Sequence, residues 1–302
     1  MVPRAEPRSY YGQPVLKEPV WKPEIPFYFF SGGLGGASAA LALAADVSGN
    51  DELARRAWLN ALAGVAVSPL LLISDLGRPE RFLNMMRMFK VTSPMSVGSW
   101  LLAASAAATS IAALNAQTGA LPGRPAKFAA AVLGLPLSTY TAALVANTSV
   151  PVWHEARWTL PFTFAASAAA SAGAAATVTT PLEAAAPARR LAVGGAIAEA
   201  LSAEFMKHHL GELGEPYAKE KAGVFRRVGA VALASGAGLL AGAGARSRPA
   251  AVAGGALVMA GALCARWSVF KAGFQSAADP KYTVGPQRAR IEAGETRGAE
   301  RR

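Results

Sequence analysis

The chain has 302 residues, of which 52% are hydrophobic and only 16% are charged, and its formal net charge is +11. Soluble proteins carry about 25% charged residues, and here the charges cluster between long apolar runs, so the composition excludes an ordinary soluble globular protein. The single cysteine, Cys264, excludes an internal disulfide and argues against a thiolate metal site. In a membrane protein the basic excess predicts contact with anionic lipid or an acidic protein partner, and no nucleic acid is expected.

Residues 1–26 contain six prolines, which disfavour a long helix, and they are predicted to form an extended N-terminal arm. Eight runs then follow that are long enough to cross a bilayer, which takes roughly 20 mainly apolar residues. They are residues 27–46, 57–75, 96–115, 128–147, 158–178, 190–206, 228–245 and 249–266. Many consist of Ala, Gly and Ser, which let helix backbones approach closely within a membrane. The chain is therefore predicted to be an all-α polytopic membrane protein, with an eight-helix transmembrane domain over residues 27–268 and a basic C-terminal tail over 269–302.

A short segment occurs in two similar copies. Residues 19–29, PVWKPEIPFYF, resemble residues 151–164, PVWHEARWTLPFTF, and each copy introduces a span. The copies stand four spans apart, so they would share an orientation. We interpret them as marking two related four-helix bundles; the alternative is a chance similarity between two proline- and aromatic-rich interface segments. The last two spans carry no charge except at the turn 246–248 and are predicted to be structural.

Eight spans place both termini on one side of the membrane, here called the N-side, together with the loops 76–95, 148–157 and 207–227. Lys and Arg number 22 on that side and 8 on the other. The positive-inside rule then places the N-side in the cytoplasm. A basic face can also exist to bind a partner, and that alternative stays open.

Most polar residues near membrane depth belong to the N-side half. They are Glu24, Asp75, Ser96, Tyr140, Asn147, His154, Glu155, Glu204 and His208. Carboxyl groups, a phenol and an imidazole at one membrane edge suit a ligand with a polar head and an apolar tail. A quinone is such a ligand, because its carbonyl oxygens need hydrogen-bond donors and its reduction needs protons. Each residue also has a simpler interpretation: helix capping for Glu24 and Asp75, an interfacial anchor for Tyr140, a surface histidine for His154, and a lipid or partner contact for Arg78.

The span 190–206 is the only one with carboxylates well inside it, Glu199 and Glu204. Buried carboxylates are costly in lipid and usually face a protein interior or an aqueous cavity. Five residues apart, they are rotated by about 140° and do not share one helix face, whereas Glu204 and His208 do. The three histidines, His154, His208 and His209, all lie at span ends, so neither haem nor another metal is expected.

Three stretches carry a resemblance to a known family. They are EPVWKPEIPFYFFSGGLGGAS (residues 18–38), SDLGRPERFLNMMRMFKVTSPMSVGSW (74–100) and NTSVPVWHEARWTLPF (147–162). Together they resemble the polysulfide reductase membrane-subunit (NrfD/PsrC) family over residues 10–215. The resemblance implies a haem-free anchor with eight or more spans in the bacterial plasma membrane. Its partners would be a ferredoxin-like iron–sulfur subunit with [4Fe–4S] clusters and, through it, a molybdopterin catalytic subunit.

The resemblance also implies roles for particular residues in exchanging two electrons and protons with menaquinone or ubiquinone. Tyr140 matches a tyrosine that bonds a quinone carbonyl, and Arg78 stands in the motif loop beside the quinone. Glu24, Asp75 and His154 would serve as catalytic acids at that site. A proton path through Glu199 and Glu204 is a weaker inference.

Two alternatives remain. In familiar family members the side with the termini and the partner faces the periplasm, whereas the charge count places it in the cytoplasm. A function of another class, a secondary transporter or proton-translocating protein built from two four-helix halves, would place its polar sites near the midplane. The polar residues here gather at one boundary, which favours the quinone hypothesis.

Overall fold

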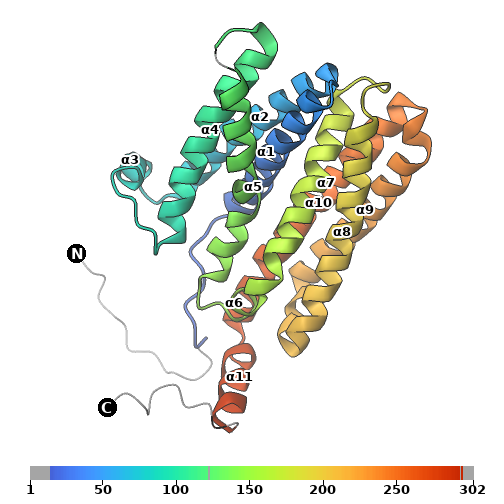
Figure 1. Ribbon diagram of the computed structural model, residues 1–302. Helices are drawn as coiled ribbons and strands as arrows, with labels where there is room; N and C mark the ends of the chain where they lie inside the picture. The colour runs from blue at the N-terminus through green and yellow to red at the C-terminus, as the bar shows by residue number, and fades with distance from the viewer. Residues whose placement is uncertain (1–13, 122, 293, 295–302) are drawn as a thin grey trace.

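The computed structural model describes residues 14–121, 123–292 and 294, and this part of the chain folds into helices with no strand. Seven helices are long and apolar enough to cross a membrane, and Figure 1 shows them lying alongside one another in a single bundle. They are α1 (Glu24–Val47), α2 (Asp51–Asp75), α4 (Pro94–Thr118), α5 (Gly123–Ala146), α7 (Leu160–Thr179), α9 (Glu220–Ala241) and α10 (Arg248–Ala278). The prediction of an all-α polytopic membrane protein is confirmed.

The predicted span 190–206 lies within another long helix, α8 (Ala186–Leu210), which packs against α7 and also contacts α9. This helix is not among the seven apolar ones. Charged side chains, among them Arg190, Glu199 and Lys207, lower its hydropathy. The structure therefore supports seven of the eight predicted spans by composition, and α8 only by its length and position.

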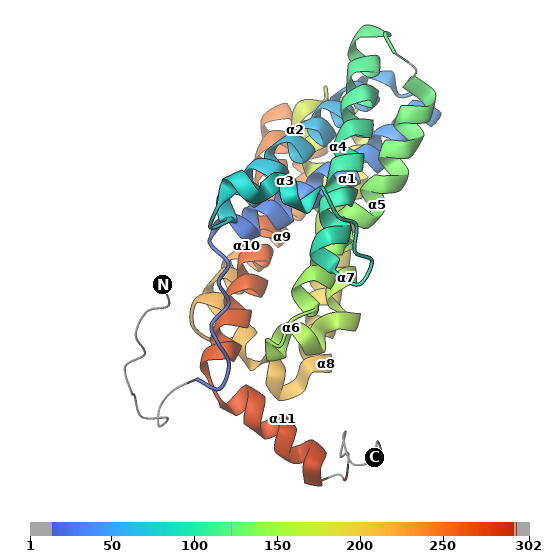
Figure 2. The same cartoon turned by 90° about the vertical axis from the view of Figure 1, so that its left-hand side faces the viewer.

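Shorter helical elements connect the long ones. They are η1 (Pro79–Arg81), α3 (Phe82–Met85), α6 (Pro151–Glu155), η2 (Ala156–Trp158), η3 (Gly211–Tyr217), η4 (Ala243–Ala245) and α11 (Lys281–Glu292). Both views place α6 and α11 at the same end of the bundle (Figures 1 and 2). Helices α1, α2, α4 and α5 pack together, and so do α7, α8, α9 and α10. Contacts of α1 with α7 and α10, and of α5 with α7, join the two sets.

The last long helix extends further than predicted. The expected span ended at residue 266, whereas α10 continues to Ala278 and α11 follows at Lys281, so the predicted tail begins inside a helix. At the other end, α1 begins at Glu24, close to the predicted start of the domain at residue 27. Residues 14–22 of the predicted arm contain no helix, and residues 1–13 lie outside the described part of the chain.

Glycines set how closely α1 approaches its neighbours. A Cβ built on Gly36 would lie 2.2 Å from the Gly134 carbonyl oxygen of α5, and one built on Gly64 of α2 would lie 2.6 Å from the Gly35 Cα. No other residue fits where two backbones touch in this way. The string GGLGG thus packs helices, as close approach through small residues predicts.

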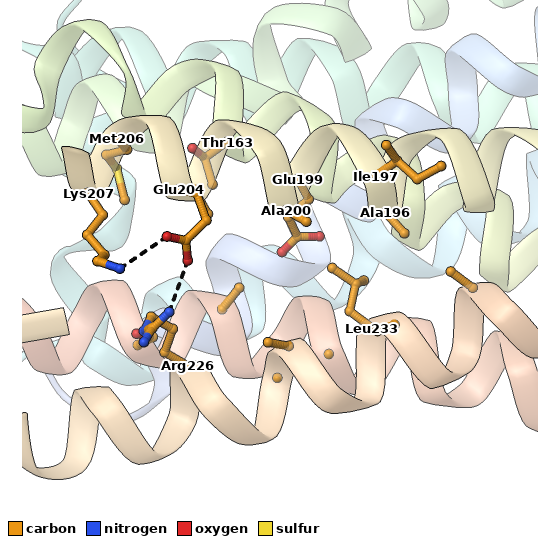
Figure 3. Close-up of a pocket in the computed structure, with 18 of the residues that line it drawn as sticks. Thr163, Ala196, Ile197, Glu199, Ala200, Glu204, Met206, Lys207, Arg226 and Leu233 are labelled. Atoms are coloured by element: carbon orange, nitrogen blue, oxygen red, sulfur yellow. Dashed lines mark hydrogen bonds and ion pairs between the residues drawn. The ribbon is translucent and has the colours of Figure 1, made fainter. Parts of the chain in front are cut away.

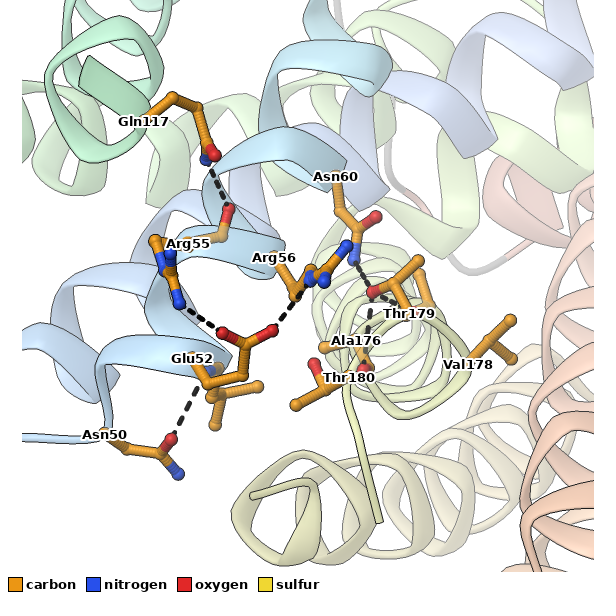
Figure 4. Close-up of polar contacts among 12 residues, drawn as sticks. Asn50, Glu52, Arg55, Arg56, Asn60, Gln117, Ala176, Val178, Thr179 and Thr180 are labelled. Carbon is orange, nitrogen blue, oxygen red and sulfur yellow. Dashed lines mark hydrogen bonds and ion pairs between the residues drawn. The ribbon is translucent and has the colours of Figure 1, made fainter. Parts of the chain in front are cut away.

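Polar contacts join the helices at the end away from α6 and α11. The Asn60 side chain of α2 donates to Thr179 Oγ1 of α7 at 3.0 Å, and Gln117 Nε2 of α4 donates to the Arg55 carbonyl of α2 at 3.1 Å (Figure 4). Lys127 of α5 forms an ion pair with Asp46 of α1 at 3.0 Å. These bonds connect both sets of helices.

Glu215 of η3 holds α11 against the bundle. Its carboxylate forms ion pairs with Lys219 and Lys281, each at 2.7 Å, and accepts a hydrogen bond from Tyr282 Oη at 2.9 Å. Hydrogen bonds from Lys219, Lys281 and Tyr282, in that order, lower the pKa of Glu215 from 4.5 to about 2. The charged form of this carboxyl group is therefore favoured by α11 docking.

We predict that Gly36→Ala lowers the stability of the protein by about 1–3 kcal/mol, because overpacking forces neighbouring backbones apart. The measurement is thermal unfolding of the detergent-solubilised protein. Gly194→Ala on α8 is the control, since a Cβ there meets no atom within 4 Å. Equal melting temperatures for the two variants would contradict the close contact.

We predict that α11 leaves η3 in acid. Lys219 and then Lys281 and Tyr282 of α11 depress the pKa of Glu215, so the part that docking contributes is complete above pH 4.5 and is lost as the pH falls toward about 2. A nitroxide on Gln287→Cys, in a Cys264→Ser background, should become more mobile over that window. The same label in a Glu215→Gln protein should show no such transition, and a transition there would assign the change to another group.

Candidate functional site

Two tyrosines meet where α1 and α5 approach the end of α2. The rings of Tyr28 and Tyr140 pack edge to face, with centroids 6.5 Å apart. Tyr140 also lies directly against α4, since a Cβ on Gly98 would be 2.1 Å from its Cε2. The glycine thus creates the space that the Tyr140 ring fills. The Tyr28 hydroxyl is buried without a hydrogen-bond partner, and the Tyr140 hydroxyl makes no hydrogen bond within the described residues.

Two carboxyl groups stand at the same end of these helices. Glu24 lies in the first turn of α1, one turn before Tyr28, and its buried Oε2 has no hydrogen-bond partner in the part of the chain that the structure describes. Asp75 is the last residue of α2, and its Oδ1 accepts a hydrogen bond from the Lys22 backbone N–H at 2.8 Å. The two carboxylates are close enough to repel each other electrostatically. Four of the polar side chains at this end therefore form one cluster, here called the α1/α2/α5 cluster: Glu24, Tyr28, Asp75 and Tyr140.

Asp75 does not cap its own helix. A negative charge at a helix C-terminus is unfavourable, and the carboxylate instead binds the backbone of the N-terminal segment just before α1. Lys22 reinforces this contact, because its Nζ donates to the Ser74 carbonyl at 3.1 Å. The N-terminal segment is also held by aromatic stacking of Trp21 on Trp153, with centroids 5.4 Å apart. Trp153 is fixed in turn by a hydrogen bond to the Val269 carbonyl at 2.7 Å.

The structure does not join Arg78 or His154 to this cluster. Arg78 is exposed in extended backbone before η1, and the His154 side chain is exposed on α6. Neither side chain forms a hydrogen bond or ion pair with Glu24, Asp75 or Tyr140 among the described residues. Ser96 stabilises the loop 76–95 instead, since its hydroxyl accepts a hydrogen bond from the Lys90 N–H at 3.0 Å and donates one to the Met88 carbonyl at 3.1 Å.

The other residues named from the sequence are dispersed. Glu155 pairs with Arg157 at 3.5 Å, and Asn147 and His208 are exposed. No group of three or more His, Cys, Asp or Glu side chains within the described ranges is arranged to hold a metal ion.

Glu199 and Glu204 occupy different environments on α8. Glu199 is 2% exposed, and among the described residues neither carboxylate oxygen meets the geometry of a hydrogen bond, although the Ser167 hydroxyl and the Arg266 guanidinium interact with it. The Glu204 side chain is 57% exposed and pairs with Lys207 and Arg226, each at 3.1 Å. Both carboxylates nevertheless line one cavity of about 510 Å³ between α8, α9 and α10, toward which they project in Figure 3. The 140° rotation between the two residues on α8 thus does not prevent both side chains from lining the same cavity.

Arg266 corrects the prediction that the last two spans carry no charge inside them. It is 2% exposed, donates to the Phe164 carbonyl of α7 at 3.0 Å, and lies 3.6 Å from the centre of the Phe164 ring. It also reaches α1, where a Cβ on Gly33 would be 3.5 Å from its Nη2. Arg266 was taken as the end of a span, but the apolar sequence beyond it continues the helix. This apolar continuation is the sequence signal that would have placed Arg266 inside the bundle. There Arg266 interacts electrostatically with Glu199.

A family model described as "Polysulphide reductase, NrfD" matches residues 13–190, which is more than half of the chain. A search of the curated proteins found no match. The match covers α1 to α7 and the first residues of α8. It therefore includes the whole α1/α2/α5 cluster and leaves Glu199, Glu204 and Arg266 outside.

We predict that Asp75→Ala loosens the N-terminal segment. A hydrogen bond to a charged group is worth about 1.5–3 kcal/mol, and less when it is partly exposed, so cleavage by trypsin after Lys17 should accelerate about 5- to 10-fold. Asp75→Asn is the control, because the amide oxygen can still accept from the Lys22 N–H. Equal cleavage rates for wild type and Asp75→Ala would show that aromatic packing alone holds the segment.

Proposed function

Because the chain belongs to the polysulphide reductase NrfD family, and is thereby a membrane subunit of a redox complex, we propose that it is the subunit that reacts with quinone. In this proposal it exchanges electrons between an iron–sulfur partner and menaquinone or ubiquinone. The observation that carries the proposal is the α1/α2/α5 cluster, in which a phenol and two carboxyl groups retain unused hydrogen-bonding capacity.

Tyr140 is the proposed hydrogen-bond donor to a quinone carbonyl. A phenol hydroxyl donates one hydrogen bond, so it can polarise the carbonyl without giving up its proton. The Gly98 contact fixes the ring from one side and Tyr28 packs against it from another. A donor held in this way loses little freedom when the substrate arrives, which favours binding.

Glu24 and Asp75 are the proposed proton donors. Reduction of a quinone to a quinol takes two electrons and two protons, and oxidation returns both. Electrons would come from [4Fe–4S] clusters of the partner, so this chain supplies binding and protons. Two carboxyl groups that repel each other share protons more readily than isolated ones, because ionisation of one disfavours ionisation of the other. His154 and Arg78, exposed at the same end, would serve proton exchange with water and contact with the partner or with lipid head groups.

The proposed partner is a ferredoxin-like iron–sulfur subunit that links this chain to a molybdopterin catalytic subunit. It would bind on the N-side, where Arg78 and the loop 207–227 present basic residues that suit an acidic surface. The excess of Lys and Arg favours a cytoplasmic N-side in a bacterial plasma membrane. A partner-binding role for the same basic surface would also suit the periplasmic orientation that the resemblance implies.

We further propose that α8 is the eighth span, and that α1, α2, α4, α5 and α7–α10 are two related four-helix bundles. The support is that α8 has 25 residues and lies along α7. Its charges are then tolerated because Glu199 faces the protein and Glu204 lies near the helix end. A transmembrane domain from α1 to α10 would follow the extended segment, with the C-terminal tail starting after Ala278.

A proton path from Glu199 to Glu204 is the second part of the proposal. Glu199 and Arg266 place an acid and a cation inside the bundle, and such groups in membrane segments commonly serve proton movement. This buried pair is also the observation that favours the alternative, a proton-translocating protein. The cavity shared by both carboxylates gives the path a connection toward the N-side.

We predict that Tyr140→Phe lowers quinone turnover of the assembled complex about 5- to 150-fold, since one lost hydrogen bond to the substrate costs about 1–3 kcal/mol. Asp75→Asn should lower turnover as well, while keeping the Lys22 contact. The measurement is quinol oxidation or quinone reduction by complexes of matched subunit content.

Thr139→Val is the matched control, because it removes a neighbouring hydroxyl of α5 that donates only to the Pro136 carbonyl. Its turnover should equal wild type. The proposal fails if Tyr140→Phe and Asp75→Asn, assembled normally, both keep wild-type turnover.

A further inference from the structure

The cavity between α8, α9 and α10 is separate from the α1/α2/α5 cluster. It has a volume of about 510 Å³ and is walled mainly by small or apolar side chains, among them Ala196, Ala200, Ala230, Ala234 and Leu233. Volumes of 300–1,000 Å³ are usual for small-molecule sites. A void of this size with such walls suits an apolar ligand, because few of its lining atoms are polar.

The cavity is elongated along the helices. Its lining on α9 extends from Arg226 to Ala241, which is about 22 Å at a rise of 1.5 Å per residue. One leaflet of the hydrocarbon core is about 15 Å thick. Part of its wall lies at the surface of the bundle, since Ile197 is 55% exposed and Ala230 and Ala234 are also exposed. The cavity is thus long enough for a lipid-like tail, and its exposed wall lies on helices that are proposed to face the membrane.

Polar groups without partners line the same cavity. Both Glu199 carboxylate oxygens, Thr163 Oγ1 and Tyr217 Oη are buried and make no hydrogen bond within the described residues. The three residues are 2%, 4% and 3% exposed. A buried polar group left unpaired costs about 1–3 kcal/mol. Ser167 and Arg266 offset part of this cost at Glu199, but three such groups around one cavity still favour a ligand that supplies partners.

The chemistry of these groups restricts the head group of the ligand. An ionised carboxylate only accepts hydrogen bonds, whereas the Thr163 and Tyr217 hydroxyls both donate and accept. A hydroxyl group on the ligand suits this set, because it can donate to a Glu199 oxygen and also accept from a hydroxyl such as Thr163 or Tyr217. At the mouth, Lys207 and Arg226 flank Glu204 and leave one positive charge in excess, which tolerates a neutral or an anionic head.

We propose that this cavity binds one amphiphile with a hydroxyl-bearing head group and a long apolar tail. The head lies beside Glu199, Thr163 and Tyr217, and the tail follows α9 away from Arg226. The chemistry fits two sources: the quinol form of a prenyl quinone, and a phospholipid with a glycerol head. The site does not depend on the proposed reaction at Tyr140, whose residues lie on other helices.

The test is native mass spectrometry of the purified full chain in detergent, with dioleoyl phosphatidylglycerol and decylubiquinol as probes. Ala234 lines the cavity, so Ala234→Trp should fill it and lower the affinity for one of the two probes at least 10-fold. Ala107→Trp, at an exposed position of α4, is the matched control and should bind as wild type does. Glu199→Leu should weaken binding too, because it removes the acceptor. Ala230→Phe is a second blocking variant, and equal melting temperatures ensure that each variant is folded.

Each outcome decides between the sources or overturns the proposal. Loss of the phosphatidylglycerol adduct alone in Ala234→Trp identifies a lipid site. If Ala234→Trp loses one equivalent of decylubiquinol and keeps phosphatidylglycerol, the cavity is a quinol site. Any second equivalent of decylubiquinol should then be removed by Tyr140→Phe, which shows that the two sites are distinct. The proposal is overturned if wild type retains neither probe, or if the folded blocking variants bind both probes as wild type does.

Discussion

The close approach of α1 to α2 and α5 is the constraint on which the rest of this structure depends. Membrane helices gain no net hydrophobic drive from associating, so they must gain contact area through small residues. Gly36 and Gly134 allow two backbones to touch, and Gly35 and Gly64 do the same on the other side of α1. With α1 fixed between α2 and α5, Glu24, Asp75 and Tyr140 come together from three separate helices. Glycine packing therefore sets the helix positions on which the candidate site depends, and the Lys22–Asp75 hydrogen bond joins the helix ends there.

A second constraint comes from charges buried in the other half of the bundle. Arg266 uses a carbonyl and an aromatic ring of α7 as partners, and Glu199 faces it without a hydrogen bond. Replacing both groups by apolar residues would often stabilise such an interior, so their presence points to a function rather than to stability. Their position beside a long apolar cavity connects that function with a ligand or with protons.

The two polar regions differ in what supports them. The α1/α2/α5 cluster lies within the part of the chain that matches the polysulphide reductase NrfD family, and its proposed role follows the family. The α8/α9/α10 cavity lies almost wholly beyond the matched residues, and its proposed role rests on unpaired polar atoms and shape alone. One end of the molecule carries the Trp21–Trp153 stack, α6 and α11, and these elements hold the N-terminal segment and the last helices together. A partner bound there would contact both halves at once.

The sequence by itself determined the membrane class, the positions of the long helices and the family, because apolar runs and the motif around Asp75 are local signals. It also pointed to Glu24, Asp75 and Tyr140 as candidates, although it could not show that Tyr28 joins them. Only the tertiary structure separated His154 and Arg78 from that cluster, placed Arg266 inside the bundle, and showed that Glu199 and Glu204 share a cavity. The physical reason is that helix length and hydropathy are properties of consecutive residues. Which faces meet, and which polar groups remain unpaired, depends on glycine contacts between helices far apart in the chain.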